Sequence, residues 1–152
     1  ICGDSALLDS FKRVRHDILC LPRDKSQLAT EVCKMRTKMR EHVLANSIEK
    51  IDLKQCAGGI TDIEFMAQYW VLAFAHDNEK MTQFPDNLRI FDIAAQENII
   101  DKTTASKLQA AYLALREQYH HLTLADTKYA DASEALEAIR EKVKAHWNAL
   151  FN

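Results

Sequence analysis

Apolar residues recur along most of the chain at intervals of three and four positions, which is the spacing of one face of an α-helix. Asp4 or Ser5 caps the start of the first such stretch, and Pro22 stops it, while Asp86 caps the start of the stretch near residue 86. The stripes run over residues 4–20, 28–43, 61–77, 86–95, 108–122 and 136–150. Joined by short links, they predict an all-α fold, an up-and-down bundle of five or six helices.

One segment interrupts the helical spacing. Ile51 and Leu53 alternate with polar residues, which predicts one short extended segment near residues 48–56. This segment leads directly into the adjacent glycines Gly58 and Gly59. The double glycine therefore marks the place where the chain leaves and re-enters helical structure.

The helix after the glycines has a well-defined predicted start. Thr61 and Glu64 have the spacing of a capping box, in which each side chain accepts a hydrogen bond from a backbone amide at the helix start. The residues from there to about Asp77 are apolar on nearly every face. We expect this helix at the centre of the bundle, because only surrounding helices can cover such a surface.

Composition supports a helical domain. The chain has 152 residues, of which 47% are hydrophobic, and it contains 3 glycines and 2 prolines. Average usage is about 7% glycine and 5% proline, so too few turn-forming residues are present for a sandwich, a barrel or a glycine-rich phosphate loop. No apolar run reaches the roughly 18 residues of a membrane span, which excludes a membrane partner.

The cysteines and the first residues bear on cellular context. Cys2, Cys20, Cys33 and Cys56 lack both CxxC and zinc-finger spacing, which favours free thiols in a reducing cytosol. The chain starts at Ile1 with no initiator methionine and no signal-peptide pattern. We interpret it as a piece of a longer cytoplasmic polypeptide.

Charge is unevenly distributed around a formal net charge of −2. Residues 11–40 carry nine lysines and arginines against three acids, whereas residues 60–101 carry eight acids against two basic residues. Four cations occupy alternate positions of the second predicted helix: Lys34, Arg36, Lys38 and Arg40. They form either a solvated face or a site for nucleotide phosphates or an acidic partner. A nucleic-acid partner is not expected, since the domain is not basic overall.

Metal chemistry has weak support. The six histidines show no HExxH pattern, and the adjacent His120 and His121 diverge by about 100° on a helix. Asp62 and Glu64 look like a D-x-E metal pair, but residues two apart on a helix diverge by about 200°. A structural role is favoured for both carboxylates, and we expect no metal site.

The segment around the glycines carries a specific resemblance. Residues 51–65, IDLKQCAGGITDIEF, resemble the signature of the bifunctional glutamine synthetase adenylyltransferase/adenylyl-removing enzyme family. In that family a strand ending in lysine leads to Gly-Gly, a hydrophobic residue and Asp-Ile-Glu-Phe, which Lys54, Gly58, Gly59, Asp62 and Glu64 match. Residues 30–40, 86–90 and 115–122 also look like helices of the family, so that the resemblance covers most of the chain.

The resemblance implies an architecture and an activity. Such enzymes carry two nucleotidyltransferase domains of the DNA-polymerase-β type, each followed by a helical domain. One half transfers AMP from ATP to a tyrosine of glutamine synthetase, and the other removes it by phosphorolysis. The PII signal protein and glutamine set the direction. Residues 1–152 look like the single helical accessory domain that follows the adenylylating half.

The same resemblance sets expectations for ligands. The family's Mg²⁺-binding carboxylates belong to Gly-Ser and Asp-x-Asp motifs in the preceding nucleotidyltransferase domain, and no such motif occurs here. We therefore expect no catalytic residue in this fragment, no tightly bound ATP or Mg²⁺, and no activity of the fragment alone. The expected partners are glutamine synthetase, PII and the preceding nucleotidyltransferase domain.

Three roles remain open for the domain. In the first, the Gly58-Gly59 turn faces the nucleotidyltransferase cleft, Lys54 offers its charge to phosphates, and Asp62 orients Lys54 or the domain interface. Glu64 belongs to the same candidate group. In the second, the basic helix from Lys34 to Arg40 docks glutamine synthetase or PII. In the third, the helices only stabilise a neighbouring domain.

Overall fold

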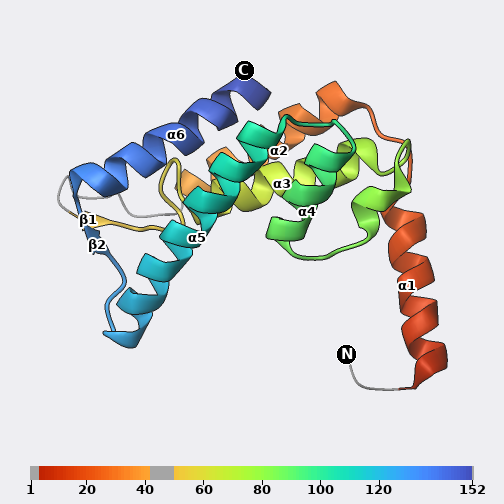
Figure 1. Ribbon diagram of the computed structural model, residues 1–152, viewed down its shortest axis with the longest axis horizontal. Coiled ribbons are helices and arrows are strands. Elements are labelled where there is room, and N and C mark those ends of the chain that lie inside the picture. Colours follow the sequence, from red (N-terminus) through yellow and green to blue (C-terminus); the bar gives the residue numbers. More distant parts are fainter. Residues whose placement is uncertain (1–3, 42–49, 152) are drawn as a thin grey trace.

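The computed structural model describes residues 4–41 and 50–151, and it is an all-α helical bundle with a minor two-stranded sheet (Figure 1). This confirms the predicted fold class. The α-helices are α1 (Ser5–Leu19), α2 (Lys25–Glu41), α3 (Ile60–Phe74), α4 (Asn87–Gln96), α5 (Lys102–Leu124) and α6 (Glu134–Phe151). The remaining elements are the strands β1 (Lys50–Ile51) and β2 (Ala130–Asp131) and the short 3₁₀-helix η1 (Glu79–Thr82).

Helix α3 forms the centre of the bundle, as its all-round apolar sequence predicts. It packs against α2, α4, α5 and α6. Ile63, Met66 and Ala67 are fully buried, and the Trp70 ring meets the ring of Phe91 on α4 edge-on at 5.9 Å between centroids. The position of α3 fixes the turn that precedes it, because that turn leads directly into the first residues of the helix.

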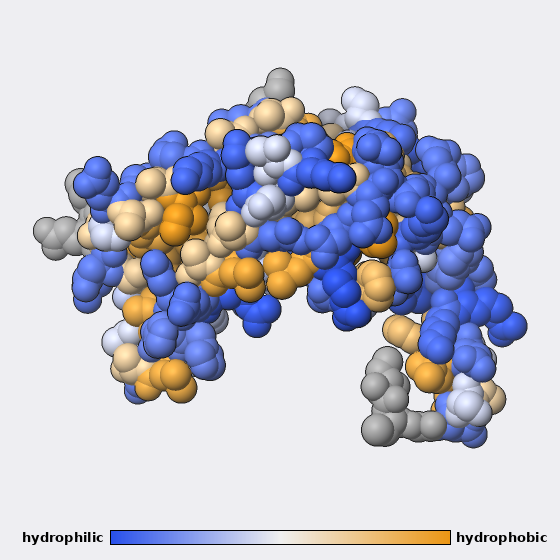
Figure 2. Space-filling model, in the orientation of Figure 1, coloured by the Kyte–Doolittle hydropathy of each residue, from blue (hydrophilic) through white to orange (hydrophobic). Residues whose placement is uncertain are grey.

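Helix α1 projects from the bundle as an arm (Figure 1). The prediction of a helix capped by Asp4 is confirmed, since the Asp4 carboxylate accepts a hydrogen bond from the Ala6 amide at 2.8 Å. No residue of α1 is buried, and apolar side chains are visible on the arm (Figure 2). The hydrophobic spacing thus predicts the helix correctly without indicating whether the bundle covers it.

The start of α3 differs from the predicted capping box. The N-cap residue is Gly59 and the helix begins at Ile60, so Thr61 is the second residue inside the helix, two positions beyond the N-cap. The Thr61 hydroxyl is buried and lacks a hydrogen-bond partner among the described residues, while Glu64 accepts a hydrogen bond from Tyr112 instead. The capping-box prediction is therefore wrong. By contrast, the predicted cap of α4 by Asp86 is confirmed by a 3.1 Å bond from the Arg89 amide.

The predicted extended segment is reduced to a short strand. Lys50 and Ile51 pair antiparallel with Asp131 and Ala130. Residues 52–59 instead form turns. Residues 42–49 lie outside the described part of the chain, and so do the parts of the predictions that fall on Val43 and Ile48.

The described residues also bear on the cysteines and on membrane-spanning helices. Cys20, Cys33 and Cys56 are free cysteines, and Cys2 lies outside the described residues. Among the described helices, not one combines the length and the apolar character needed to cross a membrane.

Candidate functional site

The turn between β1 and α3 is built by hydrogen bonds to its own backbone. The buried Asp52 carboxylate accepts from the amides of Lys54 and Gln55, both at 3.0 Å. The amide of Ile60 then donates to the Leu53 carbonyl at 3.0 Å, and that of Thr61 donates to the Lys54 carbonyl at 3.1 Å. The turn carbonyls thereby satisfy amides of the first turn of α3 that a capping side chain would otherwise bind.

The two glycines are required by close backbone approaches. Gly58 has a φ of +73°, and a Cβ atom there would lie 2.3 Å from the carbonyl oxygen of Arg140 on α6. A Cβ atom at Gly59 would lie 2.6 Å from the carbonyl oxygen of Leu53. The Arg140 guanidinium also donates to the Ala57 carbonyl at 3.2 Å. The turn is therefore held against α6, and both glycines are buried.

An aspartate and two arginines form a cluster beside this turn. The Asp62 carboxylate is 1% exposed and accepts from Arg36 Nε at 2.6 Å. A terminal nitrogen of Arg40 donates to both Asp62 oxygens, at 2.7 and 2.6 Å, and the Gly58 amide donates at 2.7 Å. Arg36 also donates to the backbone carbonyl of Gln55 at 2.8 Å. We call Arg36, Arg40 and Asp62 the Arg–Asp cluster.

The geometry of the Arg–Asp cluster indicates a structural role. Both Asp62 oxygens are occupied by donors, so the carboxylate has no free position for a metal ion or a transferred proton. The paired Arg36 side chain is also 1% exposed, whereas Arg40 is 34% exposed and lies over the Trp147 ring at 5.6 Å. The cluster ties α2 to the turn and leaves one positive charge in excess, because two guanidinium groups face one carboxylate.

The remaining candidates from the sequence lie in different surroundings. Lys54 is exposed at the edge of the turn, and within the described ranges its ammonium group pairs with no acidic side chain. Glu64 is half-buried and accepts from the Tyr112 hydroxyl at 3.2 Å, which in turn accepts from Asn87 at 2.9 Å. Asp62 thus points to α2 and Glu64 to α5, as the divergence of positions two apart predicts.

The four cations from Lys34 to Arg40 divide into two pairs on α2. Arg36 and Arg40 stand four residues apart and share the face that meets Asp62. Lys34 and Lys38 stand four apart on another face and are exposed. Of these four side chains, the two lysines and the outer part of Arg40 present positive charge to solvent.

Sequence reasoning missed several members of this region. Tyr112 and Arg140 hold α3 and the turn from distant segments, and Gln55 in the turn itself accepts from Arg36; the sequence contains no local signal for these contacts. Arg36 and Arg40 had such a signal, because two arginines four apart fit one buried carboxylate.

No three His, Cys, Asp or Glu side chains in the described part of the chain gather as a metal site. Burial also raises the pKa of the Cys56 thiol, which Arg140 opposes only in part.

Comparisons with known proteins show what the chain resembles. The family model described as GlnD PII-uridylyltransferase matches residues 33–132. A bifunctional glutamine synthetase adenylyltransferase/adenylyl-removing enzyme of Alteromonas mediterranea is 68% identical over 99% of this chain, which covers 15% of that relative. The enzyme of the same description from Vibrio parahaemolyticus is 40% identical over 99% of the chain, covering 16% of the relative. The chain therefore spans about a sixth of the length of these relatives.

Proposed function

Because this chain belongs to the GlnD PII-uridylyltransferase family, and aligns over 99% of its length with two adenylyltransferases, we propose that it is a helical accessory domain of a bifunctional glutamine synthetase adenylyltransferase/adenylyl-removing enzyme. The observation that carries the proposal is the 68% identity to one such enzyme across nearly the whole chain. The compared stretch covers 99% of the chain and therefore spans the positions of the turn, the glycines and the Arg–Asp cluster.

The parent enzyme transfers AMP from ATP to a tyrosine of glutamine synthetase, and its other half removes the AMP. ATP and Mg²⁺ serve this reaction in the parent. The described residues do not fit a Mg²⁺ site, since no cluster of metal-ligating side chains forms and Asp62 is saturated by four hydrogen bonds. The proposal assigns the metal-binding carboxylates and the chemical step to another part of the parent chain.

The domain contributes Lys54 to the edge of the nucleotidyltransferase cleft. Its ammonium group is exposed, while the backbone on both sides is fixed by the Asp52 carboxylate and by the bonds to the start of α3. Because the backbone of the turn is already fixed, only the Lys54 side chain has to be ordered when its ammonium group meets a phosphate. If desolvated, such a charge-assisted contact is worth about 1.5–3 kcal/mol.

The test is Lys54→Ala in the full-length enzyme. We expect kcat/KM for AMP transfer to fall by roughly tenfold to a hundredfold, because about 1.4 kcal/mol corresponds to one factor of ten. Lys142→Ala is the matched control, since Lys142 is an exposed lysine on α6. Unchanged transfer kinetics in Lys54→Ala, with normal folding by circular dichroism, contradict the cleft role.

A second function is favoured by the exposed lysine pair of α2. Lys34 and Lys38 form a basic face that suits docking of glutamine synthetase or PII. Arg36 is unsuitable for testing this, because its replacement would break a buried ion pair. Lys34→Glu combined with Lys38→Glu in the full-length enzyme discriminates the two roles. A change restricted to the response to PII, glutamine or glutamine synthetase concentration supports docking, and a loss of ATP turnover supports the cleft role.

A further inference from the structure

An apolar stripe on α1 is exposed although its residues are large. The stripe consists of Leu7, Phe11, Val14 and Ile18, which are 72%, 55%, 52% and 53% exposed. Single exposed apolar residues are ordinary on protein surfaces, but a continuous row along one helix marks an interaction site. The row continues beyond the helix at Leu21, which is 53% exposed.

The spacing of the stripe defines what fits it. Within α1, from Leu7 to Ile18, the intervals are four, three and four residues, the pattern of the seam between two supercoiled helices. Such a seam is narrower than the face that a helix presents to a globular core. It accepts the apolar ridge of a second helix crossing at about 20°. The stripe is therefore suited to an amphipathic helix.

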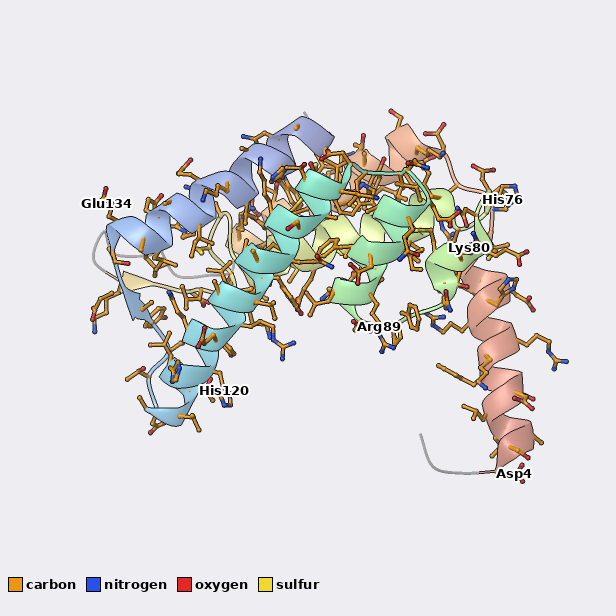
Figure 3. The ribbon with its side chains drawn as sticks, in the orientation of Figure 1. Asp4, His76, Lys80, Arg89, His120 and Glu134 are labelled. Carbon is orange, nitrogen blue, oxygen red and sulfur yellow. The ribbon has the colours of Figure 1, made fainter. Side chains whose placement is uncertain are left out.

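The bundle fixes α1 from a different side and leaves the stripe open. Arg15 donates to the carbonyl oxygens of Thr82 and Phe84, and His16 lies 3.4 Å from the Glu79 carboxylate. Leu19 packs against the core. Figure 3 shows that His76 and Lys80 lie at the end where α1 joins the bundle, and that Asp4 lies at the far tip. The arm is thus attached through its carboxyl-terminal half.

An apolar groove lies next to the attached end of the arm. It is lined by Arg15, Leu19, Val71, Leu72, Pro85 and Ile90, contributed by α1, α3 and α4 with the loop before α4. Arg15 and Leu19 belong to both the groove and α1, so the groove and the stripe border one another along the helix. A helix seated on the stripe has a continuous apolar surface on which its end can rest.

We propose that the α1 stripe is the docking ridge for an amphipathic helix of the same polypeptide that lies outside residues 1–152. The inference rests on the proposed function, which makes this chain part of a longer enzyme. The chain covers 15% and 16% of the two relatives, so most of each related polypeptide is available to supply the helix. A tethered segment also benefits from a high effective concentration.

A second copy of the chain fits the stripe less well. A coiled coil between separate chains needs a pattern sustained over roughly three to four heptads, whereas Leu7 to Leu21 covers about two. The same short seam suffices when the partner is held nearby in the same chain. The stripe therefore serves as an internal domain contact that sets the position of the bundle relative to the rest of the enzyme.

The test is hydrogen exchange of the α1 amides in the full-length enzyme. Phe11→Gln combined with Ile18→Gln removes the apolar seam, and glutamine keeps a good helix propensity. We expect the amides of residues 5–19 to exchange roughly tenfold to a hundredfold faster than in the unmodified enzyme. Arg13→Gln is the control, because Arg13 lies on the same exposed helix outside the stripe, and it should leave exchange unchanged.

Two results would overturn the inference. One is fast exchange of residues 5–19 already in the unmodified enzyme, or exchange that the double variant does not alter. The other is a change of oligomeric state by light scattering, in which the unmodified enzyme is a dimer and the double variant is a monomer. The stripe would then bind a second copy. The kinetics of Lys54→Ala remain a separate readout, so failure of this inference is distinguishable from failure of the proposed function.

Discussion

Replacing Asp62 by asparagine should destabilise the domain more than any other change of one carboxylate to an amide. The substitution keeps the size of the side chain and removes its charge. Asp62 receives hydrogen bonds from Arg36, Arg40 and the Gly58 amide. An asparagine has one oxygen and one NH₂ group at these positions. Its NH₂ group would therefore face at least one of the N–H donors that now bind Asp62.

The magnitude follows from burial. Arg36 and Asp62 are each 1% exposed, so the variant leaves a buried guanidinium without its counter-charge. Breaking a buried ion pair by removing one partner costs about 3–5 kcal/mol. The contribution of Arg40 is smaller, because its side chain is 34% exposed and solvent screens its charge. We therefore expect a loss of about 3 kcal/mol, a large share of the roughly 5–15 kcal/mol that stabilises a typical domain.

Urea unfolding followed by circular dichroism measures this loss. Asp77→Asn is the control, because Asp77 is 66% exposed and lies 3.6 Å from Lys25, so it should change the free energy of unfolding by less than about 1 kcal/mol. The cost of Arg36→Met should also be smaller in the Asp62→Asn background than in the unmodified chain. A loss in Asp62→Asn no larger than that of the control refutes the reasoning.

Two further predictions concern stability. Gly58→Ala should cost at least about 1–2 kcal/mol, because alanine disfavours a positive φ and its Cβ meets the Arg140 carbonyl; an unchanged urea midpoint contradicts this. Burial lowers the pKa of His146 below its usual 6.5, so its neutral form favours the folded state. Its contribution is complete above pH 6.5 and is lost as pH falls towards the folded-state pKa, and His146→Gln should flatten the pH dependence of the urea midpoint in that window.

The fold was largely predictable because its signals are local. Helical spacing gave the six helices, and single side chains such as Asp4 and Asp86 marked two of their starts. The central position of α3 followed from its apolar surface alone. The start of α3 was not predictable from the Thr61–Glu64 spacing, because amides there bond to carbonyls of the preceding turn and the helix begins earlier at Ile60.

The candidate site was less predictable because its contacts join distant segments. Spacing placed Arg36 on a basic face beside an apolar stripe, but its burial depends on Asp62, which is 26 residues away. The resemblance directed attention to Asp62 and the two glycines, which the structure brings together, although it could not show that Asp62 bonds to α2. For α1 the apolar spacing correctly predicts a helix. Sequence periodicity carries no information, however, on which polypeptide covers the apolar face of that helix.

The contact between the double-glycine turn and α6 has a consequence for the order of folding. The Ala57 carbonyl and the Arg140 side chain are separated by 83 residues, so the turn acquires this contact only after α6 has been synthesised and has packed. Pairings of such long sequence separation form late, because the chain must first lose the entropy of closing a large loop. Until then the start of the apolar α3 has no neighbour on that side. A nascent chain halted after α5 should therefore expose the side of α3 that faces α6, bind chaperones and be readily cleaved by proteases near residues 52–59.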